Sequence, residues 1–172
     1  MHVVGSNNNL GDVAPVPAEW EVRDRATNEW MREAFEDATE SGAAAVLLVI
    51  QANPGFDESD PTRAPSRDLG LSGRRTVSPK SSAPSARRRS RFPSRSCWSH
   101  GDSHYFRVDK PLLDAQGRRV ENFTRVETPG DNPQSGNNDV QWVKALVEPR
   151  SREVFSFQPQ VVPDNRVAVP AP

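Results

Sequence analysis

The chain has 172 residues, enough for one domain with a sizeable core, yet only 34% of them are apolar and sixteen are proline. With a mean hydropathy of −0.73, we expect part of the chain not to fold. No apolar run is long enough to span a bilayer, no signal peptide is visible, and a single cysteine excludes an internal disulfide. We expect no membrane association and, by default, a cytoplasmic location.

The net charge of −1 hides an asymmetry along the chain. Residues 63–99 hold ten Lys or Arg against one Asp, a local charge of +9, and the remainder holds twelve basic and twenty-two acidic residues, a charge of −10. Ten of these thirty-seven residues are serine and four are proline. Two different kinds of chain are therefore joined, and we predict that residues 57–99 are disordered.

The first elements predict an α/β protein. His2 and its neighbours indicate the end of a short strand followed by a polar turn, with a structural role for the histidine. From Trp20 to Ser41, apolar residues recur at helical spacing, and Gly42 follows as a helix stop. We expect the stripe of large side chains on this helix to pack against a sheet; it consists of Trp30, Met31 and Phe35.

A continuous apolar run, Ala43–Ile50, predicts a strand covered on both faces in the centre of an α/β sheet. Open sheets place their chemistry at the carboxyl ends of such strands. Gln51 and Asn53 follow this strand. An amide is a weaker transition-metal ligand than imidazole, so two roles are open for Gln51, a ligand or a loop cap.

The stretch His100-Gly101-Asp102-Ser103-His104 is the one cluster of potential metal ligands in the sequence. Two imidazoles and a carboxylate within five residues, with a glycine that permits a sharp turn, could face one divalent cation. A polar loop after a strand explains the same residues. Strands are predicted further on at residues 105–108, 119–126, 141–147 and 154–157, the last two forming a hairpin with Trp142 and Phe155 packed inward.

These residues carry a family resemblance. Gly101 to His104, followed by Tyr105 and Phe106, resembles the last motif of calcineurin-like metallophosphoesterases, Gly-His-x-His. The runs FRVDKPL, ENFTRVE, VQWVKALVEP and VFSFQPQ resemble the C-terminal part of a bacterial branch of that superfamily, as do VVGSNN and VLLVIQANPGF upstream. The likeness covers residues 2–56 and 100–162 and is absent between them.

The resemblance implies a partial α/β/β/α sandwich made of two pieces, residues 1–56 and 100–162, with a disordered insert at 57–99 and a flexible tail at 163–172. It also implies a phosphate ester hydrolase that uses two divalent cations, Mn, Fe, Mg or Zn. The metal ligands implied are His104, Asp102 in place of the first motif histidine, His100, and Gln51 where the family has His-x-x-Pro. The phosphate contacts implied are Asn53, Arg107, Lys110 and Arg125, although solvated charges at strand ends explain the three basic residues equally well.

In the family, a strand like the one predicted at His2 follows further ligand motifs, Asp-x-His, Gly-Asp-x-x-Asp, and Gly-Asn-His or Gly-Asp-Asn, and none of them precedes that strand here. We therefore expect that the metal is not retained and that this chain does not hydrolyse a phosphorylated small molecule by itself. The alternative from another class is a protein that binds nucleic acid weakly through residues 63–99, with Phe92 and Trp98 stacking on bases.

A frameshift is a further hypothesis for residues 57–99. Residues 95–99 can be encoded CGG TCC TGC TGG TCC, and with C preceding, the frame one base back reads Pro-Val-Leu-Leu-Val. That is the buried strand which the motif at His100 should follow. In the present frame we expect coil there, a sheet without that strand, and marginal stability.

Overall fold

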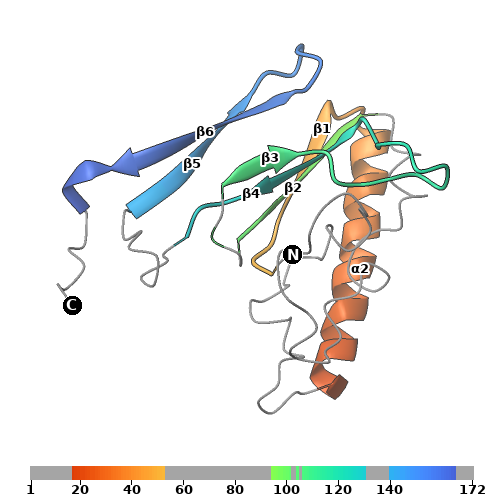
Figure 1. Ribbon diagram of the computed structural model, residues 1–172. Coiled ribbons are helices and arrows are strands. Elements are labelled where there is room, and N and C mark those ends of the chain that lie inside the picture. Colours follow the sequence, from red (N-terminus) through yellow and green to blue (C-terminus); the bar gives the residue numbers. More distant parts are fainter. Residues whose placement is uncertain (1–16, 53–93, 102–103, 105, 131–139, 166–172) are drawn as a thin grey trace.

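The computed structural model describes residues 17–52, 94–101, 104, 106–130 and 140–165. In these parts the chain forms a long helix, a four-stranded mixed sheet and a separate two-stranded hairpin (Figure 1), which confirms the α/β class. The elements are α2 (Pro17–Glu40), β1 (Ala45–Val49), β2 (Arg95–His100), β3 (Arg107–Asp109), β4 (Phe123–Glu127), β5 (Val140–Val147), β6 (Phe155–Val162) and a 3-10 turn (Pro163–Asn165). No helix among the described residues has the length and apolarity needed to cross a membrane.

The four-stranded sheet has the order β1-β2-β4-β3. β1, β2 and β4 are parallel, and β3 runs antiparallel to β4. Leu48 pairs with Trp98, and Trp98 pairs with Arg125, so the three parallel strands are in close register. Their carboxyl ends consequently meet at one edge of the sheet.

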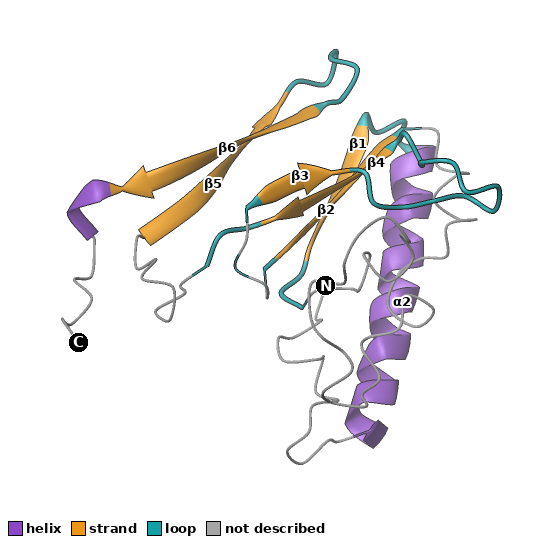
Figure 2. Cartoon of the chain, in the orientation of Figure 1, coloured by secondary structure: helices purple, strands orange, loops and turns teal. Residues whose placement is uncertain are grey.

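Helix α2 runs along one face of this sheet (Figure 2) and confirms the predicted amphipathic helix. Met31 is 2% exposed and belongs to the core cluster with Leu48, Ile50, Ala52, Trp98, Val120 and Phe123, against which Phe35 packs. The helix ends as predicted, because Gly42 adopts φ +65° and Ala43 N–H donates to the Ala38 carbonyl at 2.8 Å. The prediction for Trp30 is wrong. Its side chain is 52% exposed, since one residue turns the helix by about 100° from the buried direction of Met31.

Among the described strands, β1 lies at the edge of the sheet, and one of its faces is exposed, so the prediction of a strand covered on both faces is wrong. Leu48 is buried beneath α2, whereas Leu47 and Val49, which point to the opposite face, are 39% and 59% exposed. Within the described residues, β1 pairs with β2 alone. The composition of this strand fits a central position, and its place in the topology does not.

Strand β2 occupies the centre of the sheet, between β1 and β4. Ser96, Cys97 and Trp98 are all buried, at 4%, 1% and 0% exposure. The prediction that nothing folds in residues 57–99 is therefore wrong for the last residues of that segment, while residues 57–93 lie outside the described residues. Backbone hydrogen bonds to two neighbours hold this polar sequence in a strand that its side chains did not predict.

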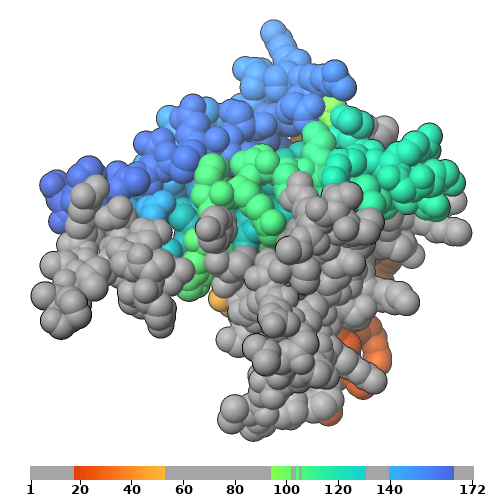
Figure 3. Space-filling view, viewed as in Figure 1, coloured from red at the N-terminus to blue at the C-terminus, as the bar shows by residue number. Residues whose placement is uncertain are grey.

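Strands β5 and β6 form the predicted hairpin, with Val147 opposite Phe155 at the turn and Val140 opposite Val162 at the open end. The prediction that Trp142 packs inward is wrong, because its side chain is 50% exposed; Phe155 is half-buried. The hairpin borders the molecule as a ridge in the space-filling view (Figure 3). A two-stranded hairpin has no further layer to bury both of its faces.

Candidate functional site

The carboxyl ends of the three parallel strands bring polar residues into a row. Beyond β1 and β2, the Gly101 N–H donates to the Gln51 carbonyl at 3.1 Å. Beyond β4, the Thr128 N–H donates to the His100 carbonyl at 2.8 Å. Gln51, Gly101 and Thr128 thus lie side by side at the edge where open α/β sheets carry their sites.

His104 also reaches this edge. The Gly130 N–H donates to the His104 carbonyl at 3.4 Å, and the imidazole lies directly against Gly130. A Cβ atom added to Gly130 would stand 2.6 Å from His104 Cδ2 and 2.7 Å from Cγ, closer than real contacts allow. The His104 backbone has φ +62°, a left-handed conformation that is uncommon outside glycine and often found at functional positions. His104 is exposed, and Gly130 is the residue that leaves room for its ring.

His100 has a different environment. It is the last residue of β2, is 1% exposed, and its Nδ1 lies 3.0 Å from the Gly101 carbonyl oxygen. Because a carbonyl only accepts, this bond requires the proton on Nδ1. Because His100 is buried and His104 is exposed, the two imidazoles do not face a common surface. His100 therefore has a structural role at the end of β2.

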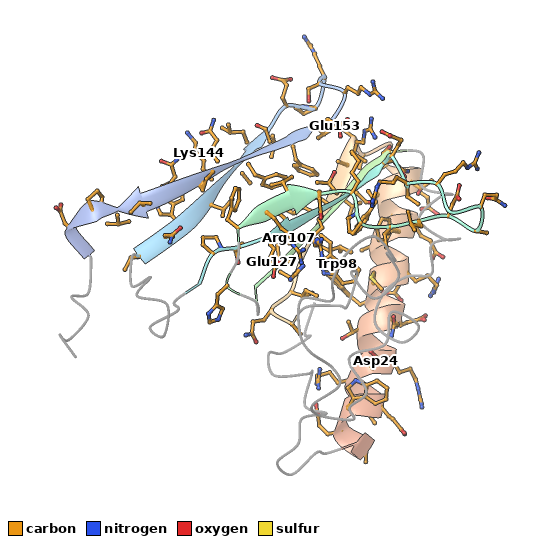
Figure 4. All side chains as sticks on the ribbon, viewed as in Figure 1. Asp24, Trp98, Arg107, Glu127, Lys144 and Glu153 are labelled. Atoms are coloured by element: carbon orange, nitrogen blue, oxygen red, sulfur yellow. The ribbon has the colours of Figure 1, made fainter. Side chains whose placement is uncertain are left out.

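Buried charges lie next to this edge. The carboxylate of Glu127, the last residue of β4, is fully buried and accepts a hydrogen bond from Arg107 Nε at 2.6 Å (Figure 4). One rung along, Arg125 is fully buried and donates to both carboxylate oxygens of Asp109, at 2.8 and 2.5 Å. Arg107 and Arg125 were both predicted to contact phosphate, but their guanidinium groups are engaged by Glu127 and Asp109, and that of Arg125 is fully buried.

The sequence interpretation missed the acidic partners of these pairs. Arg107 and Asp109 alternate on β3, and Arg125 and Glu127 alternate on β4. In antiparallel register the opposite charges face each other, Arg107 with Glu127 and Asp109 with Arg125. This alternation of opposite signs was the available signal for cross-strand ion pairs.

Lys110 lies at the other end of the strands. Its Nζ donates to the Glu121 carbonyl at 2.7 Å and to Glu153 Oε2 at 3.0 Å. Arg95 joins it, with its Nη2 3.4 Å from Glu153 Oε1. The Lys110 hydrogen bond holds the pKa of Glu153 below its ordinary value. Lys110 thus ties the hairpin turn to the sheet and does not belong to the edge that carries His104.

Among the described residues, the edge carries His104 and Gln51 as candidate metal ligands. Asp102 and Asn53 lie outside the described residues. Across the ranges that the structure describes, no three His, Cys, Asp or Glu side chains are grouped so that they could hold a metal ion. The described part of the edge thus presents one exposed imidazole, His104, and one exposed amide, Gln51, whereas a pair of cations takes several carboxylate and imidazole ligands.

Comparisons with protein-family models, with curated proteins and with solved structures found no match for this chain.

Proposed function

We propose that residues 1–56 and 100–162 form the C-terminal part of a calcineurin-like phosphoesterase domain, and that this sequence is catalytically inactive by itself. The supporting observation is the position of His104. The loop that contains it follows the central strand β2 and meets the ends of β1 and β4, with the Gly101 N–H bonded to the Gln51 carbonyl. The resemblance requires its last histidine motif in such a place.

Inactivity follows from the number of ligands. Two cations about 3.5 to 4 Å apart need several carboxylate and imidazole ligands, and the edge offers His104 and Gln51 among the described residues. His100 is buried, and Arg107 is held by Glu127, so neither group is presented to a phosphate ester at this edge. A single imidazole can coordinate a metal only weakly.

Calorimetric titration with Mn²⁺, together with an assay of bis(p-nitrophenyl) phosphate hydrolysis, tests the proposal. We expect no saturable Mn²⁺ binding and no hydrolysis above the rate with His104→Ala. Stoichiometric Mn²⁺ binding and turnover that disappear in His104→Ala would contradict the inactivity. The coding DNA tests the frameshift hypothesis: we expect a second frame that encodes an apolar strand before His100, and its absence would remove that hypothesis.

Nucleic-acid binding through residues 63–99 is the competing proposal, and the described end of that segment does not favour it. Trp98, which would stack on bases, is fully buried in β2. Arg95 donates to the carbonyls of Arg152 and Glu121, at 2.7 Å each. A filter-binding titration with RNA at two salt concentrations distinguishes the proposals, because phosphate contacts weaken steeply as salt rises.

A further inference from the structure

The outer edge of β1 presents backbone groups in a regular pattern. The Ile50 N–H donates to the Ser99 carbonyl, and the Ala44 carbonyl accepts from Arg95, so even-numbered residues of this segment turn their backbone groups toward β2. Ala45, Leu47 and Val49 therefore turn theirs outward, because the N–H and C=O of one strand residue point the same way and alternate along the chain. No described residue pairs with this edge.

The side chains beside this edge are apolar. Leu47 and Val49 are 39% and 59% exposed on the sheet face opposite α2. From Ala43 to Ile50 the chain has no charge and no proline. A strand edge of this kind is a ready template for pairing with another strand.

The other edges of the described sheets carry features that oppose pairing. β3 is three residues long, has a charge at each end, and is followed by Lys110 and Pro111. In the hairpin, β5 carries Lys144 and β6 carries Pro159. Charged residues, proline and short length are the usual means of protecting an edge strand. β1 has none of them.

We propose that β1 is a self-association edge, which pairs antiparallel with β1 of a second copy of this chain. The second copy fits because the segment is complementary to itself. Around a two-fold axis at Leu47, that residue faces its own copy, and Ala45 faces Val49 of the other chain. All these residues have outward backbone groups, so each opposite pair exchanges two hydrogen bonds, and no charge meets a like charge.

Disulfide capture tests the register. In a hydrogen-bonded antiparallel pair the two Cα atoms lie about 5.5 Å apart, a separation that a disulfide spans. Under mild oxidation, Leu47→Cys is expected to give a covalent dimer. Val49→Cys is the matched control, because its copies would be offset by four residues, or about 13 Å, and should crosslink far less. Cys97 does not interfere, since burial raises the pKa of its thiol to about 12.

Analytical ultracentrifugation over a range of concentrations tests association of the unmodified chain. The average mass is expected to rise from the 19.0 kDa of the monomer toward twice that value. Leu47→Lys should remain monomeric with an unchanged circular dichroism spectrum. Val108→Lys, at a 45% exposed position on the β3 edge, should still dimerise.

Three results would overturn the proposal. The first is a monomer at every concentration. This result overturns the proposal whether hydrogen exchange finds the amides of Leu47 and Val49 unprotected or protected by other parts of the same chain. The second is equal crosslinking of Leu47→Cys and Val49→Cys. The third is a dimer that Val108→Lys disrupts and Leu47→Lys does not, which would place the contact on β3. None of these results bears on the proposed phosphoesterase ancestry, because the edge of β1 is separate from His104.

Discussion

Strands β1 and β2 lie side by side, and each has the composition expected of the other's position: the edge strand is apolar and the central strand is polar. β1, with the sequence AVLLV, lies at the edge and leaves Leu47 and Val49 exposed. β2, with the sequence RSCWSH, lies in the centre, and four of its six residues are buried. Backbone pairing on two sides can therefore impose a strand where side chains do not favour one. The place of a strand in a sheet was decided here by connectivity and not by apolar content.

This difference in composition also affects how much apolar area the centre of the sheet buries. Ser96 and His100 occupy buried positions on the helix-covered face of β2, and Trp98 is the one large apolar side chain between them. The shifted frame would place Pro-Val-Leu-Leu-Val in this same strand. The frameshift stays a hypothesis, and it fits a polar sequence in a position that normally holds Val, Ile and Leu.

Trp98→Ala should show the largest contrast between the two strands. Its side chain is fully buried, so the free energy of unfolding is expected to fall by about 3 to 5 kcal/mol. Val49→Ala, at the exposed edge, should change it by about 0.5 kcal/mol. Urea unfolding followed by circular dichroism measures both. Similar losses for the two variants would mean that β2 does not carry the core.

The buried ion pair beside β2 gives the next effect. Arg125→Ala leaves the Asp109 carboxylate without its bidentate partner, and we expect a loss of about 3 kcal/mol in urea unfolding. Arg118→Ala removes an exposed ion pair with Asp114 and serves as the control, with an expected loss of about 0.5 kcal/mol. Equal losses for the two variants would show that the buried Arg125–Asp109 pair contributes no more to the free energy of unfolding than the exposed Arg118–Asp114 pair.

Ser96→Val should stabilise the protein, which sharpens the claim that β2 has too little apolar surface. Ser96 is 4% exposed, and the Asn122 carbonyl that accepts from its hydroxyl also accepts from its backbone N–H at 2.8 Å. That carbonyl stays satisfied after the substitution, so a gain of about 1 kcal/mol in unfolding free energy is expected. A loss of stability would indicate that the hydroxyl bond outweighs the added apolar area.

Glu153→Gln probes the opposite end of the strands and should have the smallest effect. The carboxylate is 46% exposed, so we expect a loss of about 0.5 kcal/mol. Lys110 lowers the pKa of Glu153 from its ordinary 4.5, so the stabilisation is present above that pH and is lost as the pH falls through the lowered value. Thermal melts of variant and wild type should therefore differ above pH 4.5 and converge once the pH falls below the lowered pKa of Glu153. Glu33→Gln, on the exposed side of α2, is the control.

Much of the fold was predictable from spacing. The helical periodicity before Gly42 gave α2 and its end, and two alternating runs gave the hairpin, whose second strand extends to Val162. β3 and β4 begin two to four residues later than predicted, at Arg107 and Phe123. Exposure was harder to predict, because it depends on which layers exist. Trp30 and Trp142 are of a residue type that is usually buried, but no described part of the chain covers their side chains.

The candidate site was predictable in part. The carboxyl-end rule predicted that the residues following β1 and β2 meet at one edge, where the Gly101 N–H donates to the Gln51 carbonyl. The residues that hold this region together were not singled out. Glu127 shows its role only once β3 and β4 are paired, and Gly130 only once the ring of His104 lies against it.

Substitutions at Gly130 and at His104 can distinguish the effect of where the His104 imidazole lies from the effect of the imidazole itself. With a methyl group at this position, the ring of His104 would have to leave its seat, yet the imidazole itself would remain in the chain. Gly130→Ala thus displaces the imidazole of His104, whereas His104→Ala removes it. A property that is kept in Gly130→Ala but lost in His104→Ala requires the imidazole and does not require its position against residue 130.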